Sequence, residues 1–355
     1  MPTSTRHSIG ILADDLTSAA DGAAPFVVRG ASAWIGRYCL PRQDCAVLGV
    51  DSGSRSLPER QAAETAARLI GQLASCSILY KTVDSTLRGH VKAELEASFE
   101  ASGRKHLVFA PAFPAAGRTT VGGVQLVNGI PVTETAYGRD PVHAARHSAL
   151  ADLVPASIAR VTLLDASTQD ELDAQVASFP EPETILWVGS PGMASALAPR
   201  LLPVVRPASE LGPLSGDILV VVGSANSRSH RQGDRLADAS GVTLLRCPEA
   251  REHDPAALLG RLSRTAAETL SSPLFGALIA TGGDTMEAIL DRLGVRTFEV
   301  LQELEPGFPL GRVELAGGRA LLIAMKAGGF GDEDALLNAV AHLRASLPHL
   351  EKVPS

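Results

Sequence analysis

The chain has 355 residues, more than the roughly 250–300 at which a single hydrophobic core stops growing, so two domains are expected. Hydrophobic residues make up 45% and charged residues 20%, the balance of a globular protein with a sizeable core. The net charge is −7 and Lys and Arg form no block, which argues against nucleic acid or an anionic membrane as the main partner.

Cysteine spacing and apolar runs restrict the class of protein further. The four cysteines form no C-x-x-C pair, so neither a zinc site nor a disulfide framework is predicted. Asp14 and Asp15 come before any apolar segment of a signal peptide could form, and no apolar run approaches the ~20 residues of a membrane span. We therefore expect a cytoplasmic protein that acts on small molecules.

In the first half of the chain, short apolar runs alternate with amphipathic stretches. This alternation is typical of β-α units and predicts a mostly parallel sheet flanked by helices. The clearest helix is "LPERQAAETAARLIGQLA", where Ser56 and Glu59 have the spacing of a capping box. Strands are predicted at "SIGILADD", "CAVLGVDSGSRS", "SILYKTVDST", "HLVFAPAFP", "ARVTLLDAS" and "ETILWVGS".

Two segments interrupt this pattern. Residues 115–150 are rich in Gly, Thr and Pro, which predicts an excursion or hairpin over the sheet. A second Pro- and Gly-rich stretch ends at residue 217, and we take residues 208–217 as a linker between domains at residues 1–207 and 218–355. Four strands, three leading into helices, are predicted in the second domain, so both domains are expected to be α/β folds with mostly parallel sheets.

Polar residues collect where the predicted strands of the first domain end. Ligands of parallel α/β sheets bind beyond the carboxyl ends of the strands, so these side chains are expected to face one crevice. Arg and Lys beside hydroxyl groups suit a carboxylate with neighbouring sugar hydroxyls, and Asp can accept from those hydroxyls or act as a general base. The residues are Asp14, Asp15, Asp51, Ser52, Lys81, Asp84, Ser85 and Arg88, with Arg118 and Thr119 in the loop after "APAFP".

In the second domain, three predicted strands run into turns of small residues. Glycines allow backbone N–H groups to approach an anion closely, and a helix N-terminus adds partial positive charge. Such turns indicate a phosphate-bearing ligand, most simply a nucleotide, although neither G-x-x-x-x-G-K-[ST] nor G-x-G-x-x-G is present. The turns contain Gly223 and Ser224, then Gly282, Gly283, Asp284 and Thr285, then Gly328, Gly329 and Gly331.

Several motifs together resemble the four-carbon acid sugar kinases, a family once catalogued only as a domain of unknown function. The resemblance runs in order from Ile11 to about Leu337, and departs from the family pattern at Ser18, where Gly is usual, and at "GSANSRSHRQ". The motifs are "ILADDLTSAADGA", "KTVDSTLRG", "APAFPAAGRTTVGGVQLVNGIPVTET", "TGGDTMEAIL", "LEPGFPLG" and "KAGGFGDEDALL".

The resemblance implies a sugar-acid-binding domain followed by a nucleotide-binding domain, and an ATP- and Mg²⁺-dependent transfer to the 4-hydroxyl of threonate, erythronate or a 3-oxo-tetronate. Phosphoryl transfer depends mainly on alignment and charge, and domain closure would exclude water. It implies that the sugar acid meets Asp14, Asp15, Lys81, Asp84, Ser85 and Arg88, and that the nucleotide meets Ser224, Gly282, Gly283, Asp284, Thr285 and Gly328.

The catalytic base is predicted among Asp15, Asp84 and Asp14. Adjacent strand residues point to opposite sides, so one of Asp14 and Asp15 should face the hydroxyls or metal while the other caps a turn. Asp15 and Asp84 are favoured as the functional pair. The sequence leaves three points open: the metal ligands, the choice of four-carbon acid and the oligomeric state, for which a homodimer is one of the options.

Two other functions fit parts of the sequence. A dinucleotide-dependent oxidoreductase acting on sugar acids would explain the polar strand ends, but lacks its glycine fingerprint. A non-catalytic sensor of sugar acids with two α/β lobes would need neither ATP nor a base. ATP turnover with a four-carbon acid distinguishes the kinase from both.

Overall fold

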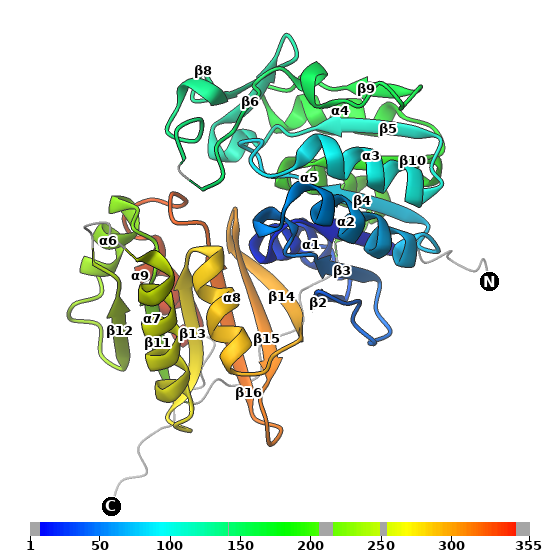
Figure 1. The fold of residues 1–355 in the computed structure, drawn as a ribbon. Coiled ribbons are helices and arrows are strands. Elements are labelled where there is room, and N and C mark those ends of the chain that lie inside the picture. The colour runs from blue at the N-terminus through cyan, green and yellow to red at the C-terminus, as the bar shows by residue number, and fades with distance from the viewer. Residues whose placement is uncertain (1–7, 141, 206–215, 249–253, 346–355) are drawn as a thin grey trace, which may run out of the picture. The chain divides into compact units, whose positions relative to one another are not determined.

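The computed structural model describes residues 8–140, 142–205, 216–248 and 254–345 (Figure 1). The chain divides into two compact units, Met1–Ala208 (unit 1) and Ser209–Ser355 (unit 2). Most of the predicted linker, residues 208–217, coincides with residues 206–215, which lie outside the described residues. Each unit is an α/β fold, as the sequence predicts.

The sheet of unit 1 consists of parallel strands in the order β2-β3-β1-β4-β10-β5-β9. Strand bounds are β1 (Ile9–Ala13), β2 (Ala33–Arg37), β3 (Val47–Asp51), β4 (Ile78–Thr82), β5 (His106–Ala110), β9 (Val161–Leu163) and β10 (Ile185–Gly189). Strands β1, β4, β5 and β10 are buried along their whole length, as expected where both faces of a parallel sheet are covered. The sequence predicts all of these strands except β2.

Helices cover both faces of this sheet (Figure 1). Their bounds are α1 (Leu16–Val28), α2 (Glu59–Leu73), α3 (Val91–Ser102), α4 (Gln169–Ser178) and α5 (Pro191–Leu201). Helices α2 and α3 pack on each other and bury Leu69 and Leu95 in one core with Leu12 of β1. On the opposite face Gly22 of α1 approaches Tyr80, and α5 packs against α1.

The predicted capping box of α2 is wrong. Ser56 belongs to a short 3₁₀ turn, η1 (Ser54–Ser56), and the helix begins three residues later, at Glu59, with Pro58 at the N-cap and no side-chain cap. Pro58 has no N–H and a fixed φ, so it lies at the helix start in place of the serine. The η1 turn thereby places its central residue, Arg55, at the carboxyl end of β3.

The predicted excursion at residues 115–150 is confirmed as a small antiparallel sheet of strands β6 (Arg118–Val121), β7 (Val124–Val127) and β8 (Ile130–Pro131). Arg118 and Thr119 were expected in a loop but lie at the start of β6, because the turn of Pro114–Ala116 directs the chain straight into the hairpin. Short 3₁₀ turns at Val132–Glu134, Leu150–Leu153 and Pro182–Thr184 complete the unit.

Unit 2 has a sheet in the order β12-β11-β13-β16-β15-β14. Its first four strands are parallel, and β15 and β14 continue the sheet antiparallel. Bounds are β11 (Asp217–Val222), β12 (Val242–Arg246), β13 (Phe275–Thr281), β14 (Thr297–Glu305), β15 (Phe308–Glu314), β16 (Ala320–Lys326), α6 (Ser227–Asp234), α7 (Pro255–Leu270), α8 (Gly283–Arg292) and α9 (Ala335–Ala345). The four predicted strands are confirmed, while the hairpin of β14 and β15 was not predicted.

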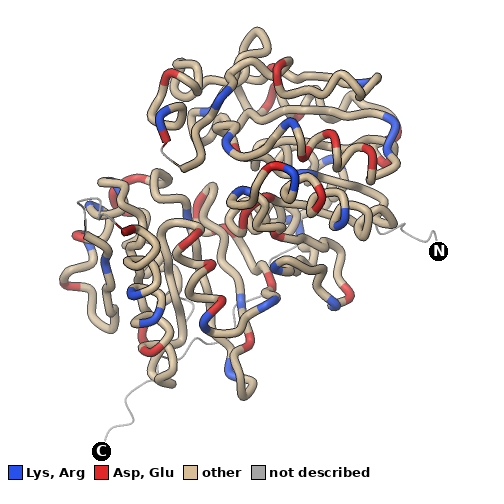
Figure 2. Tube along the Cα trace, in the orientation of Figure 1, with Lys and Arg blue, Asp and Glu red and all other residues tan. Residues whose placement is uncertain are grey.

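Lys and Arg residues are interspersed with Asp and Glu in each unit (Figure 2). Among the described residues, no helix has the length and hydropathy that crossing a membrane requires.

Candidate active site

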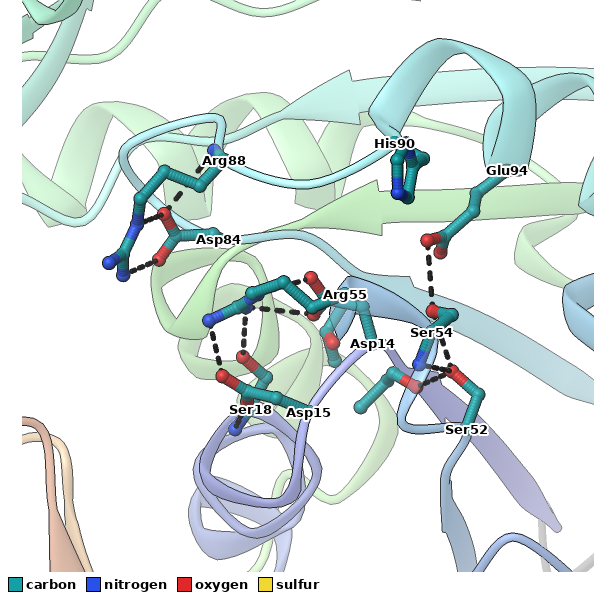
Figure 3. Close-up of polar contacts among 12 residues, drawn as sticks. Asp14, Asp15, Ser18, Ser52, Ser54, Arg55, Asp84, Arg88, His90 and Glu94 are labelled. Carbon is teal, nitrogen blue, oxygen red and sulfur yellow. Dashed lines mark hydrogen bonds and ion pairs between the residues drawn. The ribbon is translucent and has the colours of Figure 1, made fainter. Parts of the chain in front are cut away.

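The carboxyl ends of β3, β1 and β4 lie side by side and bring the predicted polar residues of unit 1 together. The parallel register aligns Ala13 with Asp51 and Leu12 with Lys81, so the segments that follow these strands leave the sheet at one edge. Asp14 and Asp15 follow β1, Arg55 follows β3, and Asp84 to Arg88 follow β4 (Figure 3).

Arg55 joins both acids that follow β1. Its Nε lies 2.8 Å from Oδ2 of Asp14 and its second terminal nitrogen donates to Oδ1 at 3.0 Å, a bidentate pair. The remaining nitrogen forms an ion pair with Asp15. Asp15 in turn caps α1 by accepting the N–H of Ser18 at 2.7 Å. The capping residue is therefore Asp15, the acid of the two that the sequence favours as functional, and its ion pair with Arg55 keeps it in the charged cluster as well.

Asp84 and Arg88 form a second bidentate pair within the loop that follows β4 (Figure 3). The Nε of Arg88 lies 2.7 Å from Oδ2 of Asp84, and its Nη2 lies 3.1 Å from Oδ1. Thr86 also donates its hydroxyl to Asp84. Between them Leu87 has a φ of +59°, a conformation that a branched residue rarely adopts and that is often found at functional sites. The loop is therefore held in one geometry.

Lys81 is buried behind this edge instead of facing outward. Its Nζ lies 2.8 Å from Oε2 of Glu94 in α3, and both side chains are almost inaccessible, at 1% and 3% exposure. Ser54 donates to the other oxygen of Glu94 at 2.9 Å, and Ser52, 2.8 Å from Ser54, donates to the carbonyl of Ala13 (Figure 3). This buried network ties the ends of β1, β3 and β4 to one another.

The β6–β8 sheet and the turn that follows it contribute a third group of side chains. Tyr137 lies between two cations, with Arg88 5.4 Å and Arg118 5.8 Å from its ring centre, and its hydroxyl accepts from Arg118 at 2.9 Å. Buried Gln125 donates to the carbonyls of Ser85 and Pro111. The hairpin is therefore fastened to the loop that carries Asp84 and Arg88.

The ionisable groups perturb one another strongly. Burial raises the pKa of Asp15, and the charge of Asp14 adds to this, against the opposing effect of Arg55. Burial would also raise the pKa of Asp84, but Arg88 and Arg55 hold it well below its usual range. Burial would lower the pKa of Arg55, yet Asp14, Asp15 and Asp84 together keep it well above its usual value. Asp84 is therefore a weak proton acceptor, and Asp15 a better one.

The predicted turns of unit 2 converge at the carboxyl ends of β11, β13 and β16. A Cβ added to Gly328 would lie 2.0 Å from Oγ of Ser224, and one added to Gly223 would lie 2.0 Å from Oγ1 of Thr285. Gly282, at a φ of +93°, donates its N–H to the carbonyl of Lys326 at 2.9 Å. These contacts leave no room for side chains at two of the glycines, so the backbones of the three turns are close to one another.

Comparison with known proteins identifies both halves of the chain. Residues 9–178 match a family described as sugar-binding N-terminal domain, and residues 249–336 one described as nucleotide-binding C-terminal domain. The chain is 33% identical to a D-threonate kinase of Cupriavidus necator, covering 93% of this chain and 96% of that protein. It is 31% identical to a D-threonate kinase of Bordetella bronchiseptica, over 95% of this chain and 97% of the relative.

The chain belongs to the four-carbon acid sugar kinases. More distant matches include a D-erythronate kinase of Heliobacterium modesticaldum, 29% identical over 52% of this chain and 49% of the relative. A 3-oxo-tetronate kinase of Pseudomonas fluorescens is 24% identical over 95% of this chain and 97% of that protein. The reaction is therefore a phosphotransfer from ATP to an alcohol group of a four-carbon sugar acid, and the oxidoreductase and sensor interpretations are set aside.

Solved structures share the fold of the kinase. A Haemophilus influenzae protein of a domain family of unknown function superposes with a TM-score of 0.71 at 19% identity, covering 94% of this chain and all of that one. A Bordetella bronchiseptica structure, 29% identical with a TM-score of 0.50, covers 95% of this chain and 98% of that one. The latter is described as a domain-swapped dimer with bound citrate.

Sequence reasoning missed several polar residues of the kinase. Arg55 lies in a Ser-rich turn whose sequence predicts the start of a helix. Glu94 lies within a predicted helix, where an acidic residue is common. Tyr137 lies in the excursion, far from Arg88 in sequence. Lys326 is the last residue of β16, and nucleotide binding was assigned from the sequence to the glycines that follow it. The rule that strand ends carry ligand-binding residues would have found Arg55 and Lys326.

Proposed function

We propose that the kinase transfers the γ-phosphoryl group of ATP to the terminal hydroxyl of D-threonate, with the sugar acid on unit 1 and ATP on unit 2. The observation that carries the choice of acid is the extent of the match to D-threonate kinases, 33% and 31% identical over more than nine-tenths of the chain. The family matches of the two halves support the division of ligands between the units.

The sugar acid would be held by the two Arg–Asp pairs at the edge of unit 1. Arg88 and Asp84 are 23% and 13% exposed, so a ligand can reach them, whereas Lys81 cannot be reached without breaking its pair with Glu94. Arg88 and Arg55 suit the carboxylate, and Asp84 and Asp14 can accept from hydroxyls. Two contacts connect this group to the hairpin: Arg118 donates to the hydroxyl of Tyr137, and Gln125 donates to the carbonyl of Ser85. We assign Lys81 a supporting position behind it.

Asp15 is the proposed general base. A general base needs affinity for the proton. Burial raises the pKa and hence the proton affinity of Asp15, whereas Arg88 and Arg55 lower the pKa of Asp84. Arg55 holds Asp15 in place through an ion pair while leaving it 24% exposed. Asp14, enclosed by the same arginine at 5% exposure, is better suited to orient that arginine.

ATP would lie on the converging turns at Ser224, Gly282, Gly283, Thr285 and Gly328. Mg²⁺ binds such sites through phosphate oxygens and water with one or two carboxylates, and Asp284 offers an exposed carboxylate in the first turn of α8. When bound, the ion would neutralise charge on the phosphates. An oxygen donor of this kind fits magnesium, and Asp284 is the residue we expect to hold it.

The proposal is tested by a coupled assay of ADP release over a panel of D-threonate, L-threonate, D-erythronate, L-erythronate and a 3-oxo-tetronate. The expected result is the highest kcat/KM with D-threonate and complete dependence on ATP and Mg²⁺. A higher kcat/KM with any other acid of the panel would overturn the choice of D-threonate while leaving the reaction class intact.

We further propose that the kinase forms a homodimer in the cytoplasm, where its substrate ATP is held. Support for the dimer comes from the Bordetella bronchiseptica structure, described as a domain-swapped dimer. Light scattering coupled to gel filtration tests this, and a mass of one 36.9 kDa chain at micromolar concentration would contradict it.

A further inference from the structure

The loop that follows β16 has an unusual set of partners. Six consecutive carbonyls, those of residues 327–332, accept hydrogen bonds from side chains. Lys326 donates to Ala327 at 3.2 Å and to Phe330 at 2.9 Å. Helix α6 supplies the other donors. The carbonyls from Ala327 to Asp332 are therefore all directed to side-chain donors of two elements.

The donors of α6 come from one stretch of its surface. Ser229 donates to the carbonyl of Gly328 at 2.8 Å. Arg228 donates one nitrogen to both Gly329, at 3.2 Å, and Gly331, at 3.1 Å. Gln232 donates its amide to Phe330 at 3.1 Å and to Asp332. Ser229, Gln232 and Lys326 are buried, so their bonds are shielded from water, whereas the two bonds of Arg228 are exposed.

Peptide geometry gives this arrangement a consequence for ligand binding. In a trans peptide the C=O of one residue and the N–H of the next point in opposite directions. Fixing the carbonyls of Ala327, Gly328 and Phe330 toward donors therefore turns the N–H groups of Gly328, Gly329 and Gly331 the other way. Successive N–H groups that face one side form an anion-binding concavity.

The loop also borders the proposed nucleotide site. Gly328 touches Ser224, and the carbonyl of Lys326 accepts from Gly282, so the loop is continuous with both other turns. Two cations, Lys326 and Arg228, lie against its carbonyl side, and their charge favours a phosphate on the opposite side. An acid, Glu305, also borders the loop, with Oε2 3.5 Å from the Cβ position of Gly331.

We propose that Arg228, Ser229, Gln232 and Lys326 form a carbonyl clamp that fixes residues 327–332 so that the N–H groups of Gly328, Gly329 and Gly331 face a phosphate of ATP, while the N–H of Phe330 closes the loop on the carbonyl of Ala327 at 3.1 Å. These four are positioning residues, because they act on ATP through the loop. The inference rests on the proposed nucleotide site. It explains why "SANSRSHRQ" lies beside the glycine-rich loop: its side chains hold that loop by the backbone and need not contact the ligand.

Arg228 is the best residue for a test, because it is exposed and its replacement should not disturb folding. Arg228→Met removes the bonds to Gly329 and Gly331, and ATP affinity should fall about tenfold or more, the value of one charged hydrogen bond. Arg228→Lys should recover part of this loss. Arg231→Met is the matched control, since Arg231 lies on the same helix and pairs with Glu333 at 3.1 Å instead of with the loop.

The readout is calorimetric binding of ATP and ADP to the full chain, together with KM for the sugar acid. The clamp predicts weaker nucleotide binding for Arg228→Met alone, with sugar-acid KM unchanged. Equal losses for Arg228→Met and Arg231→Met would overturn the clamp in favour of general charge attraction, and an unchanged affinity would overturn it outright. ATP binding is measured without the sugar acid. A failure of the D-threonate proposal would therefore be distinguishable, because the chain would bind ATP but not turn it over with D-threonate. A wild-type chain that binds no nucleotide would overturn the clamp.

Discussion

The proposed site of unit 1 consists of charged side chains, whereas that of unit 2 consists of backbone groups. At the carboxyl ends of β1, β3 and β4, Arg55 and Arg88 already neutralise carboxylates, so a ligand at the proposed site would have to exchange partners with them. At the ends of β11, β13 and β16, glycines bring peptide groups close together and side chains hold the loop from behind. A sugar acid has several distinct polar groups to be distinguished, while a phosphate needs only convergent N–H donors.

The largest effect is expected from Asp15→Asn. The amide keeps an acceptor for the N–H of Ser18, so the cap of α1 survives while the proton acceptor is lost. We expect kcat to fall on the order of 10²–10⁴-fold with KM little changed. Asp84→Asn and Asp14→Asn serve as comparisons, and should act mainly on the KM of the sugar acid. If kcat stays near the wild-type value in Asp15→Asn, another group accepts the proton.

Glu94→Gln tests whether Lys81 supports the site from behind. The substitution leaves a buried ammonium without its carboxylate, and the free energy of unfolding should drop by roughly 3–5 kcal/mol in chemical denaturation. The double variant Lys81→Met, Glu94→Leu should recover most of this stability and keep a normal KM for the sugar acid. A double variant that is stable but has a strongly raised KM would show that Lys81 contacts the ligand directly.

Arg88→Ala should weaken sugar-acid binding without affecting ATP. The loss of a charged hydrogen bond is worth about 1.5–3 kcal/mol, and KM for the sugar acid should rise accordingly. Arg88→Lys should rescue this only in part, because Lys lacks the bidentate fork. Arg60→Ala is the control, since its pair with Glu64 is 90% and 62% exposed. Equal losses of affinity for both ligands would indicate a structural role for Arg88.

Gly328→Ala should weaken ATP binding and leave sugar-acid binding unchanged, the reverse of Arg88→Ala. Its Cβ would collide with Ser224 at 2.0 Å, and overpacking of this kind costs about 1–3 kcal/mol, here as a raised KM for ATP. Gly71→Ala in α2 is the matched control, because nothing lies within 4 Å of its Cβ position. Normal ATP kinetics in Gly328→Ala would remove this turn from the nucleotide site.

The smallest effect concerns pH. Burial and Arg228 lower the pKa of Lys326 to about 8, so its charge is lost as the pH rises through that value. KM for ATP should increase a few-fold above pH 8 in the wild type and stay flat in Lys326→Met. Between about 8 and the ordinary value of 10.5 the unfolded chain binds more protons, so stability should rise with pH over the same interval. A pH-independent KM would show that the charge does not reach the phosphates.

The sequence by itself determined the fold class, most strands and the family, through the motifs that contain the proposed site residues. The spacing of apolar residues and the composition of turns are local properties of the sequence. They were sufficient to predict strands β1, β4, β11 and β13. They failed for β2 and for the β14–β15 hairpin, in which most residues of β14 are half-buried and carry a weak pattern.

Only the tertiary structure decided which charged groups meet. Arg55 and Asp14 are 41 residues apart, and Lys81 is drawn inward because Glu94 on α3 is its partner. Arg228 reaches the carbonyl of Gly329 across 101 residues. A long charged side chain takes its partner from whatever the packing of the sheet brings within about 3 Å, and that packing depends on the register of strands far apart in sequence.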